Sequence, residues 1–419
     1  MNVIIRQAKI HSGNSPHHGK QLDILISEGR IHEISPNIAT KADQEISGSD
    51  LHVSAGWFDC FATVPDPGHE YRETLQSAAS AAAAGGFTEV MVSPEAKPHR
   101  TTKTSIEYII NQSTTLPVRF YPIGGITKNL EGKELAEMYD MGKSGAMAFT
   151  DGSNPVQTPG VLLKALQYVL TNDQVIIQQP NDQSISRGGL MNEGIYSTRL
   201  GLPGAPAIAE ELMIMRDLEL LAYTNSKLHI TGISTAKSLE LIKAAKAKGL
   251  QVTCSVTPYS LLFTDADLQG YDTNFKLVPP LRGESDRDAL RAGLINGDID
   301  CIASHHTPLH QDEKDCEFEY AKPGVTGFET LFPALLEAGI PLDTIIESIT
   351  TKPRHIFNVP IPEIKEGAAA QLTVFSPTGT FTYNKQTAKS CSHNSAFLDK
   401  ELTGKVIATI SNHHTHLNS

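Results

Sequence analysis

The chain has 419 residues, of which 40% are hydrophobic and 20% charged, a composition typical of a globular protein with room for one large domain and a smaller one. It carries 35 basic and 47 acidic side chains, and the resulting net charge of −12 argues against binding to nucleic acid or to an anionic membrane. We find no run of about 18 apolar residues and no signal peptide. The five cysteines form no CxxC pair, so we expect buried thiols in a reducing cytosol and predict a cytoplasmic protein.

Short apolar runs separated by turns fill the first 54 residues. Residues 3–5, 22–26 and 30–34 predict antiparallel strands, with a hairpin turn at 27–29. The same pattern returns near the other end of the chain, at 371–375 and 404–410. We therefore predict that residues 1–54 and 366–419 pair into one small β-sandwich, which flanks a larger domain formed by residues 55–365.

A strand, a loop, a helix and a second strand follow one another at the start of the larger domain. Residues 51–58 predict a short buried strand, and Pro and Gly punctuate a loop at 65–68. An alanine-rich helix is expected within 70–84, and a second strand at 88–94. This unit is the building block of a parallel barrel, in which the chemistry lies at the carboxyl ends of the strands. We therefore expect residues 59–68 to face the functional site.

Strands and helices continue to alternate along the rest of this domain, so we predict an α/β fold, a (β/α)8 TIM barrel. The further strands are expected at 118–122, 146–149, 175–179, 228–231, 251–256 and 301–304. Helices are expected at 159–171, 207–224, 235–248, 286–296 and 326–338. Two long polar segments, 188–206 and 310–327, are predicted to be active-site or interface loops.

The stretch 56–68, GWFDCFATVPDPG, resembles the signature of the dihydroorotases, which are cyclic-amide hydrolases of the amidohydrolase superfamily. That family reads Gly, two hydrophobic residues, then Asp-x-His-x-His-x-Arg-x-Pro-Gly. Further blocks match the family in order: LHITGIST at 228–235, VTP at 256–258, GYDTNFK at 270–276, PPLR at 279–282, IASHHTP at 302–308 and PGVTGFET at 323–330. The resemblance covers essentially the whole chain and implies the amidohydrolase barrel with its composite β-sandwich.

The resemblance also implies that the catalytic groups of the family have been replaced. The positions of four zinc-binding histidines carry Phe61, Thr63, Gln179 and Gly232, the substrate-binding arginine is Pro65, and the catalytic aspartate, normally the general base, is His305. Zinc sites in hydrolases need imidazole and carboxylate ligands with a position left for water. Phenylalanine has no donor atom, and a neutral threonine hydroxyl is a poor zinc ligand. We therefore expect no metal cofactor and no catalytic residue.

Two amide groups that hold the substrate in the family are replaced as well. Glu95 aligns with the asparagine after the second barrel strand, and Val278 with the asparagine before the Pro-Pro pair. A glutamate facing a substrate carboxylate would repel it. The former substrate pocket, with Pro65, Glu95 and Val278 at these positions, is thus predicted not to hold the family's substrate.

Some ligand-type residues remain. Asp59 matches a supporting residue, Asp151 matches a bridging aspartate used by part of the family, and His306 follows the lost aspartate. Asp151, His305 and His306 leave one metal site open as an alternative, zinc being held at one site at most. Neighbouring residues on a strand point to opposite faces, so the contrary expectation is that His305 enters the pocket and His306 packs elsewhere. Cys60 as a nucleophile and a metal site at His413, His414 and His416 are weaker alternatives.

Three functional hypotheses follow. The first is a non-catalytic homologue that acts as a scaffold or regulatory partner of aspartate carbamoyltransferase, a partner implied by the resemblance together with a homodimer. The second is an active or altered cyclic-amide hydrolase, converting N-carbamoyl-L-aspartate to dihydroorotate with at most one metal. The third is a small-molecule sensor that uses the old pocket for a neutral or cationic ligand.

Overall fold

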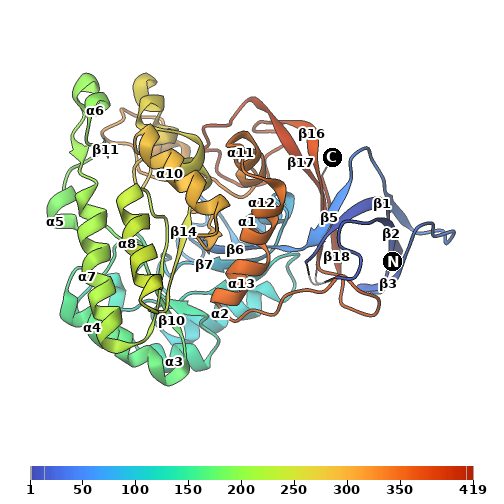
Figure 1. The fold of residues 1–419 in the computed structure, drawn as a ribbon, viewed down its shortest axis with the longest axis horizontal. Helices are drawn as coiled ribbons and strands as arrows, with labels where there is room; N and C mark the ends of the chain where they lie inside the picture. The colour runs from blue at the N-terminus through green and yellow to red at the C-terminus, as the bar shows by residue number, and fades with distance from the viewer. Residues whose placement is uncertain (1, 14, 412, 419) are drawn as a thin grey trace.

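The computed structural model describes residues 2–13, 15–411 and 413–418. A β-sandwich domain holds both ends of the chain, and a barrel surrounded by helices forms the rest of the molecule (Figure 1). Helices α4, α7 and α8 cover the side of the barrel that faces away from the sandwich. None of the helices in the described part of the chain is long and apolar enough to cross a membrane.

Eight parallel strands of the described residues form the barrel. They are β6 (Trp57–Ala62), β7 (Phe87–Val92), β8 (Arg119–Pro122), β9 (Ala148–Phe149), β10 (Val175–Gln178), β13 (Lys227–Ile230), β14 (Val252–Val256) and β15 (Cys301–Ile302). A bridge between Gly124 and Phe149 joins β8 to β9. The ring is closed where the His305 N–H donates to the Phe61 carbonyl over 3.1 Å. The predicted (β/α)8 barrel is confirmed.

Helices follow the barrel strands on the outside. They are α1 (Leu75–Ala84), α2 (Lys103–Ser113), α3 (Met138–Lys143), α4 (Pro159–Val169), α5 (Gln183–Ser186), α6 (Ile195–Leu200), α7 (Ile208–Thr224), α8 (Ala236–Ala247), α9 (Pro258–Leu262), α10 (Glu284–Ile295), α11 (Leu331–Glu337), α12 (Leu342–Ile349) and α13 (Thr351–Ile356). Two short strands, β11 (Met191–Asn192) and β12 (Gly204–Ala205), lie in the predicted polar loop 188–206. The helix predicted at 326–338 was too long, because residues 326–330 form a loop whose Thr326 N–H donates to the Asn394 carbonyl.

The sandwich domain is one hydrogen-bonded sheet built from both chain ends. Its strands are β1 (Asn2–His11), β2 (Gln21–Ser27), β3 (Arg30–Ser35), β4 (Gln44–Ile46), β5 (His52–Ala55), β16 (Leu372–Tyr383), β17 (Lys400–Ser411) and β18 (His414–Leu417). Apolar side chains from both ends share one core, in which Ile5, Val53, Val374 and Ala408 are fully buried. The pairing of β5 with β16 brings the two ends together.

The single strand predicted at 51–58 is in fact two strands, and this prediction was wrong. Residues His52–Ala55 belong to the sandwich, and Trp57–Ala62 belong to the barrel. The chain passes from one sheet to the other at Gly56, where a Cβ would lie 2.3 Å from Thr88 Oγ1. Only glycine lets the barrel and the sandwich approach this closely.

Candidate functional site

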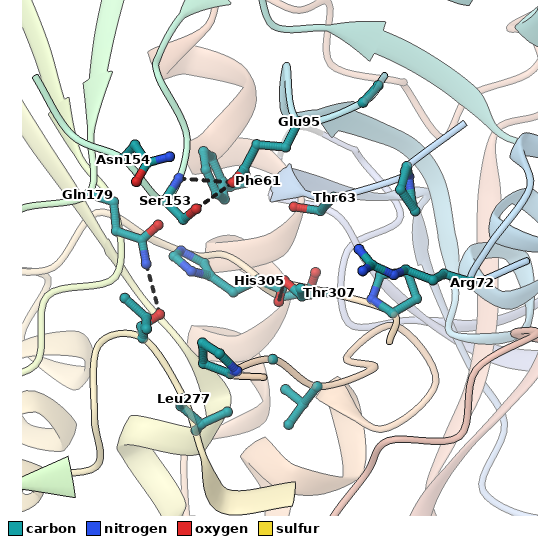
Figure 2. Close-up of a pocket in the computed structure, with 18 of the residues that line it drawn as sticks. Phe61, Thr63, Arg72, Glu95, Ser153, Asn154, Gln179, Leu277, His305 and Thr307 are labelled. Atoms are coloured by element: carbon teal, nitrogen blue, oxygen red, sulfur yellow. Dashed lines mark hydrogen bonds between the residues drawn. The ribbon is translucent and has the colours of Figure 1, made fainter. Parts of the chain in front are cut away.

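A cavity of about 280 Å³ opens at the carboxyl ends of the barrel strands, where barrels of this type place their chemistry. Seven of the positions singled out in the sequence line it: Phe61, Thr63, Pro65, Glu95, Gln179, Val278 and His305 (Figure 2). Gly232, Asp151 and His306 lie outside the lining. The structure therefore brings most of the replaced positions together and separates the residual ligand-type residues.

His305 fills the floor of this cavity. Its φ of 47° directs the ring toward Phe61, with ring centroids 4.9 Å apart, and its Nε2 lies 2.8 Å from Thr231 Oγ1. Burial lowers the pKa of His305 to about 4, so the imidazole is neutral at pH 7. An imidazole of this pKa is a weak base, far from the pKa near the working pH that suits a general base.

Gly232 and His305 share one volume. Gly232 adopts a φ of +67°, and a Cβ at this position would lie 2.7 Å from His305 Cε1. The family's ligand histidine at position 232 and the imidazole at position 305 therefore exclude each other in this backbone. The loss of the histidine at position 232 and the gain of the histidine at position 305 are therefore physically linked.

A chain of hydroxyl groups fixes the His305 ring. Thr231 Oγ1 lies 2.9 Å from Ser255 Oγ, which lies 3.1 Å from His229 Nε2. Burial lowers the pKa of His229 to about 3. Together with Cys60 and Cys301, His229 forms a buried group of potential ligand atoms within 4.8 Å of one another, and no other group of three was found among the described residues. The two cysteines lie in the apolar barrel core among Phe58, Ile177 and Phe357, away from the cavity lining.

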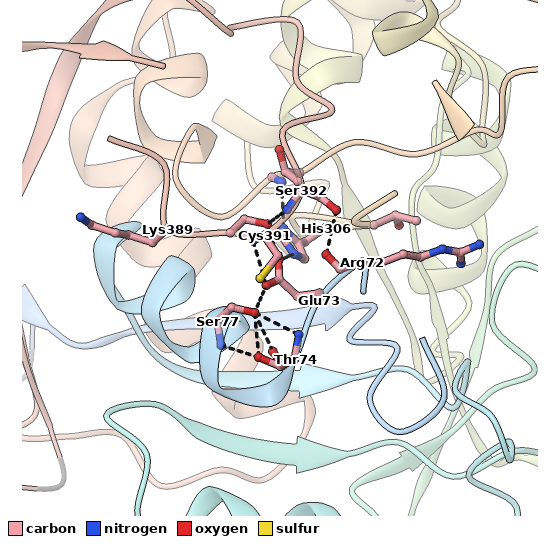
Figure 3. A network of polar contacts seen from close by, with 12 residues as sticks. Arg72, Glu73, Thr74, Ser77, His306, Lys389, Cys391 and Ser392 are labelled. Carbon is pink, nitrogen blue, oxygen red and sulfur yellow. Dashed lines mark hydrogen bonds and ion pairs between the residues drawn. The ribbon is translucent and has the colours of Figure 1, made fainter. Parts of the chain in front are cut away.

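His306 turns away from the cavity. Its ring stacks on Phe328 at 3.9 Å and 11°, and its Nδ1 accepts the Gly327 N–H over 3.1 Å. Nε2 therefore carries the ring hydrogen, and it lies 3.6 Å from Glu73 Oε2. Figure 3 shows His306 in this second network, which faces the segment around Cys391.

Glu73 anchors that segment to the barrel. Its carboxylate, fully buried, accepts the Cys391 N–H over 3.2 Å and also the hydroxyls of Ser77 and Ser390 (Figure 3). The loop between β16 and β17 thus leaves the sandwich and packs on the barrel. His306 serves this contact and not the cavity.

The two retained aspartates are engaged in structural bonds. Asp151 accepts the Thr127 N–H over 2.9 Å and its hydroxyl over 2.5 Å, and burial raises the pKa of Asp151 to about 6. Asp59 accepts the Ser304 N–H over 2.9 Å and its hydroxyl over 2.5 Å, and burial raises the pKa of Asp59 to about 7. Each carboxylate holds one barrel strand end against its neighbour.

Polar groups at the replaced positions are hydrogen-bonded within the protein. Gln179 Nε2 donates to the Val278 carbonyl over 2.8 Å, and Glu95 accepts the Ser153 hydroxyl over 2.5 Å. Thr63 Oγ1 lies 3.1 Å from the Ser93 hydroxyl. The family's ligand positions thus hold an aromatic ring, a hydroxyl, an amide and a glycine, and the His305 imidazole is already bonded to Thr231. These groups do not form a zinc ligand set. The residues present do not fit the family's metal.

Sequence reasoning missed a basic rim around the cavity. His69, Arg72, Lys97 and His99 line it from the loops that follow β6 and β7. Those loops directly follow the first two barrel strands. Their place at the carboxyl ends of these strands was the feature of the sequence that could have pointed to the cavity. Without ligand histidines the spacing of these four residues carries no motif.

The fold and the site together define a barrel of the amidohydrolase type with a composite β-sandwich. Among solved structures, the L-hydantoinase (dihydropyrimidinase) from Arthrobacter aurescens matches with a TM-score of 0.86 over 99% of this chain and 95% of that chain, at 22% identity. A D-hydantoinase matches with a TM-score of 0.82 over 100% and 95%, at 18% identity. The neighbours establish the fold.

Sequence comparison identifies the family. The family model described as "Dihydro-orotase-like" matches residues 54–238. The dihydroorotase of Syntrophotalea carbinolica is 36% identical over 98% of this chain and 97% of its own length, and that of Carboxydothermus hydrogenoformans is 38% identical over 93% and 92%. The chain belongs to the dihydroorotase family.

Proposed function

We propose that this chain is a dihydroorotase homologue of pyrimidine biosynthesis that has lost hydrolysis and acts as a scaffold or regulatory partner of aspartate carbamoyltransferase. One observation carries the proposal: the His305 ring stands 2.7 Å from the site of a Cβ on Gly232, so it blocks the place of a ligand histidine. Its Nε2 is already bound to Thr231. The replaced general base thus excludes a metal ligand.

Hydrolysis of a cyclic amide at neutral pH needs an activated water. Bound zinc supplies one by lowering the pKa of its water to about 7, and a general base near the working pH takes the proton. In this chain Phe61 and Thr63 occupy two ligand positions, and the pKa of His305 is about 4. The residues at these positions cannot activate a water molecule for hydrolysis, and we expect no metal cofactor.

The intact fold supports a role that needs the barrel but not the reaction. The chain aligns with its relatives over almost their whole length. A cytoplasmic homodimer that binds the transferase fits this pattern. The partner and the dimer rest on the family resemblance.

The enzyme alternative has at most one metal, which Asp151, His305 and His306 would hold. Their contacts oppose it, because Asp151 bonds to Thr127, His305 to Thr231, and His306 stacks on Phe328. All three would have to exchange these partners for one ion. An altered cyclic-amide hydrolase is therefore the second candidate.

Elemental analysis of untagged protein, with dihydroorotate hydrolysis assayed on the same sample, separates the two. We expect metal near zero and no turnover with added zinc or manganese. About one zinc per chain with turnover abolished by Asp151→Ala would overturn the proposal. Co-purification with aspartate carbamoyltransferase then tests the partner. If the assembly and activity of the transferase do not change when this chain is present, the scaffold role is excluded.

A further inference from the structure

A further cavity, of about 420 Å³, lies between the sandwich and the barrel domain. Its lining comes from the end of β1 and the loop after it on one side, and from α12 and α13 on the other, and no described residue lines both this cavity and the one at the strand ends. His11 of β1 and Asp343 of α12 both line it. A contact between these two side chains therefore joins the two domains.

Four titratable side chains form a continuous row across this boundary. Asp343 Oδ1 lies 3.2 Å from His11 Nδ1. The other ring nitrogen of His11, Nε2, lies 2.7 Å from Nδ1 of His52 on β5. His52 Nε2 in turn lies 3.0 Å from Asp50 Oδ1. Every nitrogen of the two rings thus faces another titratable group.

The two imidazoles of the row are buried, and the two carboxylates reach solvent. The side chains of His11 and His52 are 7% and 9% exposed, whereas those of Asp343 and Asp50 are 78% and 42% exposed. Phe375 packs against both rings, with its ring centroid 6.1 Å and 5.6 Å from theirs. The imidazoles therefore depend on the row for their hydrogen bonds, while Asp343 can turn to water instead.

The row has three contacts, but two neutral imidazoles supply only two hydrogens. An ionised carboxylate only accepts hydrogen bonds, and a neutral imidazole carries a hydrogen on one of its nitrogens. Hydrogen bonds from the Thr378 hydroxyl and from His52 lower the pKa of Asp50, so Asp50 accepts and His52 Nε2 carries the hydrogen. His52 Nδ1 then accepts from His11 Nε2. This leaves a lone pair on His11 Nδ1 that faces the Asp343 carboxylate, and this contact becomes a hydrogen bond only when a third proton is bound.

The groups bonded to His11 act on this third proton in opposite directions. Burial lowers the pKa of His11, and the charge of His52 lowers it next. The hydrogen bond and the charge of Asp343 raise the pKa, and Lys9 on the same strand lowers it. Asp343 therefore favours the protonated ring against its surroundings.

Three more titratable groups lie near His11 on the walls of the cavity. The ring of His18 meets that of His11 edge to face, with centroids 6.4 Å apart, and its Nδ1 accepts the Ser12 N–H. Glu347 of α12 and Lys352 of α13 line the same cavity and carry opposite charges. Asp343 is thus the group on the barrel side that is bonded to His11 among the described residues.

We propose that this row is a proton-dependent link between the sandwich and the barrel: His11 takes up a proton as pH falls, and its Nδ1–H then donates to Asp343 across the boundary. At higher pH His11 Nδ1 carries no hydrogen, Asp343 turns toward water, and the two domains lose this bond. The proton is exchanged with water, and the N–H bond is the only covalent bond that forms or breaks. The inference is independent of the proposed loss of hydrolysis and of any protein partner.

The link has a defined effect on stability. The ordinary pKa of a histidine is 6.5, and that of His11 in the folded chain is lower, so the unfolded chain binds the proton first and the free energy of unfolding falls as pH drops below 6.5. The bond to Asp343 limits this loss, because it favours the protonated ring. Without the carboxylate of Asp343 the loss should be larger, and the difference should be confined to acidic pH.

The test compares Asp343→Asn, His11→Gln and the double variant of the full-length protein by urea unfolding between pH 8 and pH 5. The interaction between the two positions is the factor by which the effect of Asp343→Asn on the unfolding equilibrium constant changes when His11 is replaced. We expect a factor of about 1 at pH 8 and of about three or more at pH 5. Glu347→Gln is the matched control, because Glu347 lies one turn further along α12 and lines the same cavity. Its factor with His11→Gln should stay near 1.

Nitrogen-15 spectra of histidine-labelled protein follow the proton directly. One histidine should carry its hydrogen on Nε2 alone at pH 8 and on both nitrogens in acid, and its midpoint should move to lower pH by about half a pH unit or more in Asp343→Asn, which corresponds to the threefold factor. Glu347→Gln should move no midpoint. This comparison decides even if His11→Gln fails to fold. An interaction that does not change with pH, an equal effect of Glu347→Gln, or midpoints that Asp343→Asn leaves in place would each overturn the proposal.

Discussion

The imidazole of His305 lies so close to Gly232 that a Cβ on this glycine would stand 2.7 Å from Cε1 and 3.2 Å from Nε2. Real Cβ contacts are not this short, so something must shift if position 232 gains a side chain. His305 has little freedom to shift, because its ring lies between Phe61 and Thr231. The two positions behave as one unit.

Gly232→Ala is therefore expected to destabilise the protein by more than backbone strain alone. Gly201→Ala is the matched control, because Gly201 has a φ of +66° and nothing within 4 Å of its Cβ position. A left-handed alanine costs about 1–2 kcal/mol, and overpacking adds about 1–3 kcal/mol. Urea unfolding of both variants should show the larger loss at Gly232.

His305→Ala should remove the overpacking of Gly232→Ala, so it should cost less stability in that background than in the wild-type chain. The double variant keeps the backbone strain and loses the His305 contacts with Phe61 and Thr231. If Gly232→Ala and Gly201→Ala lower stability equally, the ring does not restrict position 232.

Asp59→Asn tests the pH dependence that burial imposes. The pKa of Asp59 is raised to about 7 from an ordinary value of 3.8, so between these values the folded chain holds a proton that the unfolded chain has released. The free energy of unfolding therefore falls as pH rises through this window, by up to about 1.4 kcal/mol per pH unit. Asparagine keeps an acceptor for the Ser304 N–H and does not titrate.

The measurement is urea unfolding of wild type and variant at pH 5, 6, 7 and 8. The stability of wild type relative to the variant should fall from pH 5 through pH 7 and level off from about pH 8, when Asp59 is ionised in both the folded and the unfolded state. A difference that does not change with pH would mean that Asp59 is ionised throughout, with its Ser304 bonds outweighing burial.

The order of the barrel strands could be predicted because each is a short apolar run followed by a polar loop. The division at Gly56 could not, because residues 51–58 form one apolar run and two sheets share it. Only the approach of Thr88 to Gly56 separates them. Similarly, residues 326–330 lead directly into the apolar residues of α11, but they form a loop in which the Thr326 N–H donates to the Asn394 carbonyl.

The replaced ligand positions could be found from the sequence, since the surrounding motif fixes their places. The contact between His305 and Gly232 could not, because it depends on two left-handed residues that follow different strands. The basic rim was also out of reach. Arg72 and Lys97 line the cavity from two loops that Arg100 ties together through the carbonyls of Val64, Asp66 and Ser93, and the spacing of these residues in the sequence does not indicate those bonds.

Arg354→Met is expected to be among the most damaging single substitutions. Arg354 is fully buried and donates to Glu89 over 2.7 and 3.0 Å, to the Gly56 carbonyl and to the Thr350 carbonyl. Removing one partner of a buried pair leaves an unpaired charge and costs about 3–5 kcal/mol. The pair links α13 to β7 at the passage between the two domains.

Urea unfolding measures this loss, and Glu89→Gln in the same chain should restore part of it, since the unpaired carboxylate is then gone. The exposed pair Lys103–Glu107 provides the control, and Lys103→Met should cost less than about 1 kcal/mol. An equal effect of the two substitutions would show that the buried pair adds nothing beyond a surface one.

Restoring the first motif alone is expected not to restore metal binding. Phe61→His with Thr63→His supplies two imidazoles, but catalytic zinc sites use three protein ligands and an open position. Gln179 and Gly232 supply none, and the His305 ring still lies 4.9 Å from the ring at position 61. Elemental analysis should find less than about 0.1 zinc per chain.

Adding Gln179→His, Gly232→His and His305→Asp should bring zinc to about one per chain or more, because the ligand set is then complete with Asp151. The change at position 305 is the necessary one: it removes the ring from the volume that the histidine at 232 needs, and aspartate tolerates a left-handed backbone better than most residues. The same variant with His305 kept is the matched control and should bind less zinc. Stoichiometric zinc in the variant with only Phe61→His and Thr63→His would mean that Asp151 and the restored pair already form a site, and the exclusion of metal by His305 would be wrong.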